Sequence, residues 1–185
     1  MRVERWHPPG FLGKHVAGAW RLRGTAHGVA DFLLPDALGA DIAIELGARG
    51  RVERGGSWHT LPPRVVVAGL RRALPLIHEG EVDTIGVQLP PACTCLLGVP
   101  PAALRDTVAP LGDVAAALDD ALRMWSVGRR RPDDLFAALG RAFAPRCDRA
   151  LRATADALAS DPHAHVSALA ERAGVSPRHL QRRFL

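Results

Sequence analysis

The spacing of apolar and polar residues along the chain changes near residue 92. Before that point, short apolar runs are interrupted about every ten residues by glycine, proline or charge, a spacing typical of all-β domains. In Val82–Leu89 apolar and polar positions alternate, as in a strand with one buried face. We therefore expect strands over six segments, joined by Gly- and Pro-rich loops such as 48–64: His15–Arg23, Gly28–Leu34, Ala40–Leu46, Arg64–Gly69, Leu74–His78 and Thr84–Leu89.

Beyond this point the apolar residues recur with the period of an α-helix. Leu118, Leu122 and Trp125 fall on one stripe, and Asp113 is placed to cap the helix that carries them. Prolines suit the first turn of a helix and end the one before it. Helices are therefore expected over 100–111, 113–125, 131–145 and 147–160.

The amino-acid composition bears on which partner the protein could bind. A hydrophobic content of 48% with 23% charged residues argues against extended disorder. The net charge is +5 and is carried by arginine, since Lys14 is the only lysine. Arginine makes bidentate contacts with phosphate and guanine, so nucleic acid is a natural partner. A GC-rich coding sequence produces the same arginine bias, and charge alone does not decide between the two.

The cysteines and the first residues bear on the compartment. Cys93, Cys95 and Cys147 are odd in number and lack the spacing of a disulfide framework, which fits a reducing environment. The first ten residues, MRVERWHPPG, hold no apolar run of the kind found in signal peptides, and no 18-residue apolar stretch occurs. We expect a cytoplasmic protein without a membrane partner.

The most specific pattern occupies Val166–Phe184, where two apolar helical stripes flank a turn. Leu169 and Ala170 belong to the first stripe, and the small Ala170 allows a second helix to approach. Gly174 stands where the chain must turn. The second helix is expected to begin with Ser176 as its cap and Pro177 in its first position, and to bury Leu180 and Phe184 against the first helix.

On a helical wheel the polar residues of this second helix divide into two groups. Arg178, Gln181 and Arg182 point away from Leu180 and carry donors suited to guanine and adenine edges in the major groove. The alternative interpretation is a solvated arginine face on an ordinary helical hairpin. The candidate phosphate contacts lie along the flank and at the start of the helix, and they are Ser176, His179 and Arg183.

The segment VSALAERAGVSPRHLQRRF resembles the first helix-turn-helix of AraC/XylS-family transcription regulators. In that family the outward residues of the second helix enter the major groove, which implies base contacts for Arg178, Gln181 and Arg182. The segments 33–47 and 84–114 resemble a sensor-type N-terminal domain found in one branch of the family. The matching positions at the C-terminal end are Leu169, Ala170, Gly174, Ser176, Leu180, Arg182 and Phe184.

The chain departs from the family in two places. Pro90-Pro91 stands where the branch has Pro-Gly, and the sequence ends where the helix leading to a second helix-turn-helix should begin. We therefore expect a truncated reader whose last turn frays, because its final carbonyl groups lack partners. The expected fold class is α+β, with a barrel-like β-rich N-terminal domain and a helical segment ending in a partial helix-turn-helix. The expected domains are 1–92 (β-rich, sensor or dimerisation), 93–145 (helical extension packing on it) and 146–185 (partial DNA-binding domain).

The favoured function is a DNA-binding transcription regulator whose N-terminal domain senses a small effector or forms a homodimer. One alternative is a ligand-binding or protein-interaction β-barrel with a non-functional DNA reader. Another is a cupin-like metalloenzyme, which needs several histidines converging inside the barrel. Cys93 and Cys95 with His78 have the residue types for a metal site without its usual spacing. Ser57 lacks a nucleophile elbow, and Trp20 is expected in the core, with a pocket wall as its alternative. No catalytic residue, cofactor or metal is expected.

Overall fold

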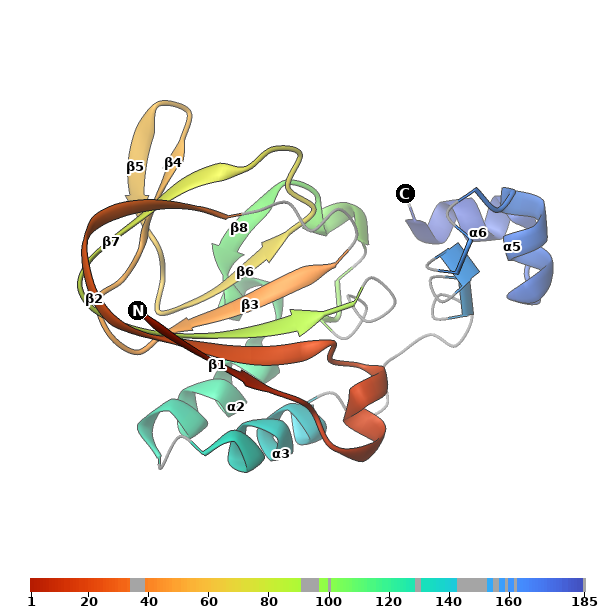
Figure 1. Cartoon of the computed structure of the whole chain (residues 1–185). Helices are drawn as coiled ribbons and strands as arrows, with labels where there is room; N and C mark the ends of the chain where they lie inside the picture. The colour runs from red at the N-terminus through yellow and green to blue at the C-terminus, as the bar shows by residue number, and fades with distance from the viewer. Residues whose placement is uncertain are drawn as a thin grey trace.

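The computed structural model describes residues 1–33, 39–90, 97–99, 101–128, 131–142, 153–154, 157–158, 160–161 and 163–184. It combines a large antiparallel sheet with short helices, as Figure 1 shows. The predicted α+β class, with a β-rich N-terminal part, is confirmed. The expected domain boundaries at 92/93 and 145/146 and the three cysteines lie outside the described residues.

The sheet has eight strands, and their order runs β1-β2-β7-β3-β6-β8, with β4 pairing to β5 and β7. All of these pairings are antiparallel. The strands are β1 (Arg2–Trp6), β2 (Gly18–Leu33), β3 (Ala40–Glu45), β4 (Arg51–Arg54), β5 (Ser57–Thr60), β6 (Arg64–Ala68), β7 (Leu74–Leu89) and β8 (Thr107–Pro110).

Strands β2 and β7 are 16 residues each and pair with one another along almost their whole length. The sequence predicted two separate strands in each case, which is wrong. Exposed glycine and charged residues such as Glu79, Gly80 and Glu81 interrupt the apolar pattern, yet the backbone ladder continues through them. The first half of β7 pairs with β4 and the second half with β3, so β7 links both parts of the sheet.

Four further strands were not predicted. The loop expected over 48–64 contains the hairpin β4–β5, which turns at Gly55 and Gly56, both at positive φ. All four residues of β5 are exposed, so it lacks the alternation that marks a half-buried strand. β1 was also missed. The helix expected over 100–111 is instead a 3₁₀ turn, η3 (Pro101–Leu104), followed by β8.

The helices of the central part are α1 (Leu111–Val114), α2 (Ala116–Val127) and α3 (Pro132–Ala142), and a 3₁₀ turn, η1 (Gly10–Lys14), precedes β2. The predicted helix over 131–145 is confirmed by α3 as far as Ala142. Asp113 is not the N-cap of a helix over 113–125. It lies within α1, and α2 begins after Ala115, which makes no side-chain capping bond.

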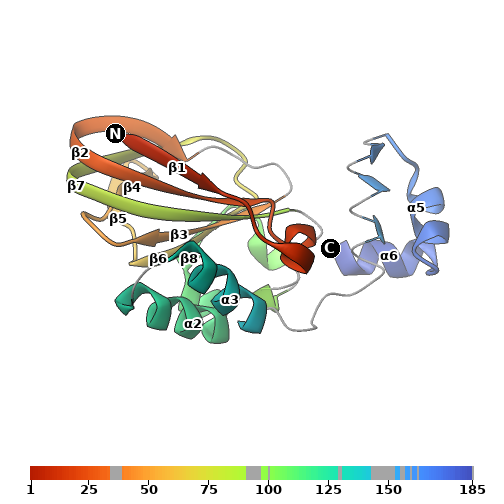
Figure 2. The same ribbon diagram turned by 60° about the horizontal axis from the view of Figure 1, so that its bottom comes forward.

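Helices α2 and α3 cover one face of the sheet (Figure 2). The core on this side joins strand residues to the helices. It includes Ile42, Ile44 and Ile85 of the strands and Leu122 and Leu139 of the helices, and each of these five is at most 1% exposed. Arg64 of β6 reaches Asp119 of α2 through Nη2, which donates to Oδ2 at 3.0 Å, and through Nε, which donates to Oδ1. A second cluster lies on the opposite face, hereafter the inner face, and contains Val52, Leu61, Val65, Val67, Leu70, Leu74 and Leu76.

On the inner face, the indole of Trp20 lies against the backbone of Gly86. The two residues are cross-strand partners in β2 and β7. A Cβ atom added at residue 86 would overlap indole Cε2, Cζ2 and Nε1. The missing side chain at Gly86 is therefore what gives the ring its place.

We expect Gly86→Ala to displace this ring and to lower the free energy of unfolding by about 1–3 kcal/mol, as overpacking does. The matched control is Gly140→Ala in α3, whose new methyl group meets Leu12 Cδ1 at 3.7 Å, an ordinary contact. Alanine in a helix interior is more favourable than glycine by about 0.5–1 kcal/mol, so this control should not destabilise. Urea unfolding, monitored by circular dichroism, measures the free energy of unfolding of both variants. A Gly86→Ala protein as stable as the parent contradicts the contact.

Candidate functional site

The helices that carry the predicted DNA contacts are α5 (Val166–Arg172) and α6 (Pro177–Phe184). They pack through Leu169, Ala170 and Leu180, which are at most 4% exposed, with Ala157 in the same cluster. Val175 of the connecting turn packs against this group. The predicted burial of the first stripe and of Leu180 is confirmed, and the side chain of Phe184 lies outside the described residues.

The turn between the helices has the hydrogen bonds of a Schellman motif. The Gly174 N–H donates to Glu171 O and the Val175 N–H donates to Ala170 O, both at 3.0 Å. Gly174 adopts a φ of 66°, in the left-handed region that favours glycine. The sequence predicted this glycine turn, and the structure confirms it.

Ser176 caps α6 as the sequence predicted. Its Oγ accepts a hydrogen bond from the backbone N–H of His179 at 3.2 Å, and its carbonyl oxygen accepts from the Leu180 N–H at 2.9 Å. The cap satisfies one of the free N–H groups at the start of the helix. Together the turn and the cap set the direction in which α6 leaves α5.

The predicted base contacts share one exposed face of α6. Arg178, Gln181 and Arg182 are all exposed, His179 is half-buried, and Ser176 is exposed at the start of the helix. The structure therefore brings the candidate base contacts together, opposite the buried Leu180. The side chain of Arg183, the remaining phosphate candidate, lies outside the described residues.

Helix α6 also comes near the β-rich part of the chain. Cα atoms of α6 lie within 8 Å of Cα atoms in η3. Leu104 of η3 is 4% exposed and belongs to the same core as α2, α3 and the sheet. The 3₁₀ turn that packs into the sheet core therefore lies close to α6.

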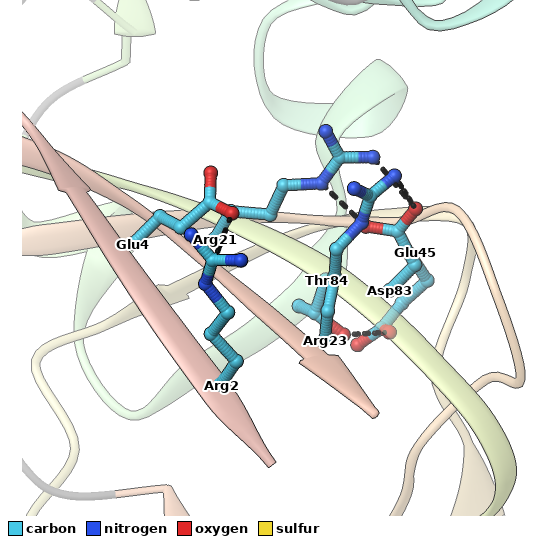
Figure 3. Close-up of polar contacts among 7 residues, drawn as sticks. All are labelled: Arg2, Glu4, Arg21, Arg23, Glu45, Asp83 and Thr84. Atoms are coloured by element: carbon cyan, nitrogen blue, oxygen red, sulfur yellow. Dashed lines mark hydrogen bonds and ion pairs between the residues drawn. The ribbon is translucent and has the colours of Figure 1, made fainter. Parts of the chain in front are cut away.

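A buried polar group on the inner face escaped the sequence analysis. Glu45 of β3, whose side chain is 2% exposed, accepts a hydrogen bond from Thr84 Oγ1 at 2.6 Å (Figure 3). Its other oxygen lies 3.5 Å from Nε2 of His78, whose side chain is 8% exposed. The signal was present in ADIAIE, where Asp41 and Glu45 alternate with Ala40, Ile42 and Ile44.

A second polar group joins β2 to β7 on the helix-covered side of the sheet. The guanidinium of Arg21 donates two hydrogen bonds of 2.7 Å to the carboxylate of Asp83, and Arg23 lies at its edge (Figure 3). These bonds from Arg21 lower the pKa of Asp83 and raise the pKa of Arg21, with the Coulomb attraction of the pair adding to both.

The residue types of a metalloenzyme are not assembled in the described part of the chain. Within it, no group of three or more His, Cys, Asp or Glu side chains is placed to hold a metal ion. His7, His27 and His59 are exposed, and Cys93 and Cys95, the proposed partners of His78, lie outside the described residues. No helix in the described ranges is long and apolar enough to cross a membrane.

Comparison with known proteins finds likeness in structure and none in sequence. No protein-family model and no curated protein matches the chain. The cupin domain of an XRE-family transcriptional regulator from Enterobacter cloacae has 17% identity over 48% of this chain and 94% of that one, with a TM-score of 0.37. The AraC-like transcriptional activator CuxR has 16% identity over 98% of this chain and 73% of that one, with a TM-score of 0.47.

ToxT from Vibrio cholerae O395 has 8% identity over 88% of this chain and 71% of that one, with a TM-score of 0.42. These values are too low for any of these neighbours to support an argument about family or activity.

The lowered pKa of Asp83 predicts a pH-dependent stability. The carboxylate stabilises the fold above the unfolded-state pKa of about 3.9, and this contribution is lost as the pH falls through the lower pKa of the folded state. We expect Asp83→Asn to lower the free energy of unfolding by about 2 kcal/mol at pH 7. The gap between the variant and the parent protein should become smaller below about pH 4.

Urea unfolding at a series of pH values measures this difference. The control is Asp120→Asn, because Asp120 is 71% exposed and its contact with Arg123, at 3.4 Å, lies at the surface. The Asp120→Asn substitution should change the free energy of unfolding little at any pH. A penalty for Asp83→Asn that is the same at pH 3 and pH 7 contradicts an origin in the ionised carboxylate.

Proposed function

We propose that the chain is a DNA-binding transcription regulator of the AraC/XylS type. In this proposal α5 and α6 form a helix-turn-helix, and the β-rich part senses a small effector or mediates dimerisation. The observation that carries the proposal is the capped α6, which presents Arg178, Gln181 and Arg182 on one exposed face. Such a protein works where the DNA is, in the cytoplasm.

The geometry of α6 suits the major groove. A single α-helix fits that groove, and residues near its N-terminal end contact base edges in helix-turn-helix proteins. Arg178 lies in the first turn of α6, and Gln181 and Arg182 follow one turn later. Arginine reads guanine through O6 and N7, and glutamine reads adenine through N6 and N7. We assign the base contacts to these residues and phosphate contacts to Ser176, His179 and Arg183.

The closeness of α6 to η3 supports a sensing role for the β-rich part. A ligand that binds this part can alter DNA affinity only if it favours one arrangement of α6 over another. Because η3 packs into the sheet core through Leu104 and lies close to α6, a shift of the sheet could change the position of α6 through η3. No catalytic step is required in this mechanism.

We expect the chain to bind duplex DNA with an affinity that falls as salt rises, by about 0.9 logarithmic units per tenfold salt for each phosphate contacted. The measurement is fluorescence anisotropy with a duplex selected from a random library, at several salt concentrations. A chain that shows no such slope, alone or extended by any downstream sequence, contradicts DNA binding. It then leaves the ligand-binding module with a non-functional reader.

Single substitutions distinguish base-specific contacts of α6 from the effect of general positive charge on DNA affinity. Arg178→Ala, Gln181→Ala and Arg182→Ala should each weaken the selected duplex by about 1–3 kcal/mol and relax its sequence preference. Arg123→Ala removes a 54% exposed arginine from α2 and serves as the matched control. If the control weakens binding as much as the α6 variants do, general positive charge and not α6 is responsible.

A further inference from the structure

The strand register shows which residues are neighbours on the inner face. Directly paired residues of antiparallel strands point to the same side of a sheet, and alternate residues of a strand share a face. Gly86 of β7 lies between Trp20 of β2 and Ala43 of β3 in one row across the sheet. The next row on one side contains Leu22, Thr84 and Glu45, and the next row on the other side contains Gln88, Asp41 and Val67.

The centre of this face is built from small residues, and Ala43 packs there against the cluster that contains Val52 while staying partly exposed. Gly86 and Ala43 stand side by side, and the indole of Trp20 rests on Gly86. Ala43 and Trp20 remain half-buried, whereas Ile42 and Ile44 on the opposite face of the same strand are at most 1% exposed. The helices thus seal one face of β3, and the other face keeps contact with solvent between its two acids.

Two carboxylates flank the centre of this face. Asp41 and Glu45 stand on either side of Ala43, about 7 Å away along the strand in each direction. The described inner-face residues of β3, β6 and β7 include no lysine or arginine. Arg54 of β4 shares this face with Val52, and its guanidinium donates hydrogen bonds to the carbonyl oxygens of Val108 and Asp106. Arg5, the cross-strand partner of Trp20, is exposed on the edge strand β1.

Hydrogen-bond acceptors outnumber donors beside Glu45. Its carboxylate can accept about four hydrogen bonds. Among the described residues it receives one, from Thr84. Nε2 of His78 is fully buried and lies 3.5 Å from the second carboxylate oxygen, and within the described part of the chain it makes no hydrogen bond. Buried acceptors without donors are costly, so a ligand that brings N–H groups is favoured here.

We propose that the inner face binds a small organic ammonium ion, with Glu45 and Asp41 as its counter-ions and the indole of Trp20 as its aromatic wall. This rests on the proposed effector-sensing role and names the chemical class of the effector. Carboxylates supply charge-assisted hydrogen bonds to ammonium groups, and an indole face attracts a cation. Two carboxylates four residues apart on one strand suit a linear molecule with an ammonium group at each end.

The test uses three five-carbon probes that differ only in their end groups: 1,5-diaminopentane, pentane-1,5-diol and glutarate. Isothermal titration calorimetry of the full chain should detect the diamine and neither the diol nor the dianion. Because the proposal depends on charge, diol or glutarate binding as tight as that of the diamine overturns it. Failure of the parent chain to bind the diamine overturns it as well.

Isosteric variants then locate the site. Glu45→Gln keeps an oxygen for Thr84 and Asp41→Asn keeps the size of its side chain, and each should weaken diamine binding about tenfold or more. Glu79→Gln is the matched control, since the side chain of Glu79 is 64% exposed and forms an ion pair with Arg51 at 3.1 Å. Circular dichroism confirms that each variant is folded. Diamine affinity unchanged in folded Glu45→Gln and Asp41→Asn proteins overturns this site.

The same preparations distinguish this inference from the proposed function. DNA binding without diamine binding overturns the ammonium site and leaves the regulator role standing. Diamine binding without DNA binding supports the site and removes the regulator role. A change in DNA affinity at saturating diamine, absent in Glu45→Gln, supports both and identifies the ammonium ion as the effector.

Discussion

The pairing of β2 with β7 is the constraint on which the rest of the structure depends. These strands run side by side from the Gly18↔Gln88 pair to the Leu33↔Leu74 pair. β1 pairs with the first half of β2, β3 with the second half of β7, and β4 with the first half of β7. Because the partners are far apart in sequence, this ladder must close a long loop before the remaining strands have an edge to join.

The same ladder separates two chemically different faces. Along the second half of β7, Ile85 and Val87 turn to the helices and are fully buried, while Thr84 and Gly86 turn to the inner face. Asp83 is an exception on the helix-covered side, where the Arg21 guanidinium neutralises it. Because side chains alternate along a strand, one set of residues packs against the helices and the other set faces the proposed ligand site. A shift of one residue in the register would exchange the two sets.

Sequence patterns predicted the correct structure where only one face of an element is buried or where a turn requires particular residue types. The segments that became β3, β6 and α3 have regular apolar spacing, and the turn at Gly174 with the cap at Ser176 needs residue types that few other sites require. Patterns failed where the partner strand decides the conformation. β5 is wholly exposed, and Thr107–Pro110 is a strand because it pairs with β6. No local signal distinguishes that segment from a helix that starts after two prolines.

The candidate sites divide in the same way. The exposed face of α6 could be predicted because Arg178, Gln181 and Arg182 belong to one short helix whose orientation follows from Leu180. The acids of the inner face alternate visibly in ADIAIE. Their neighbours Thr84, His78 and Trp20 come from β7 and β2, and only the register brings them together.

Two of the outer strands of the sheet, β1 and β8, have a consequence for self-association. β1 presents Arg2, Glu4 and Arg5 within five residues, and β8 is four residues long and ends at Pro110, which has no N–H to donate. Charged or short edges with proline resist pairing with the edge of another molecule, the usual route to uncontrolled aggregation of β-proteins. A dimer that used the β1 or β8 border would therefore have to form through side chains and not by extending the sheet.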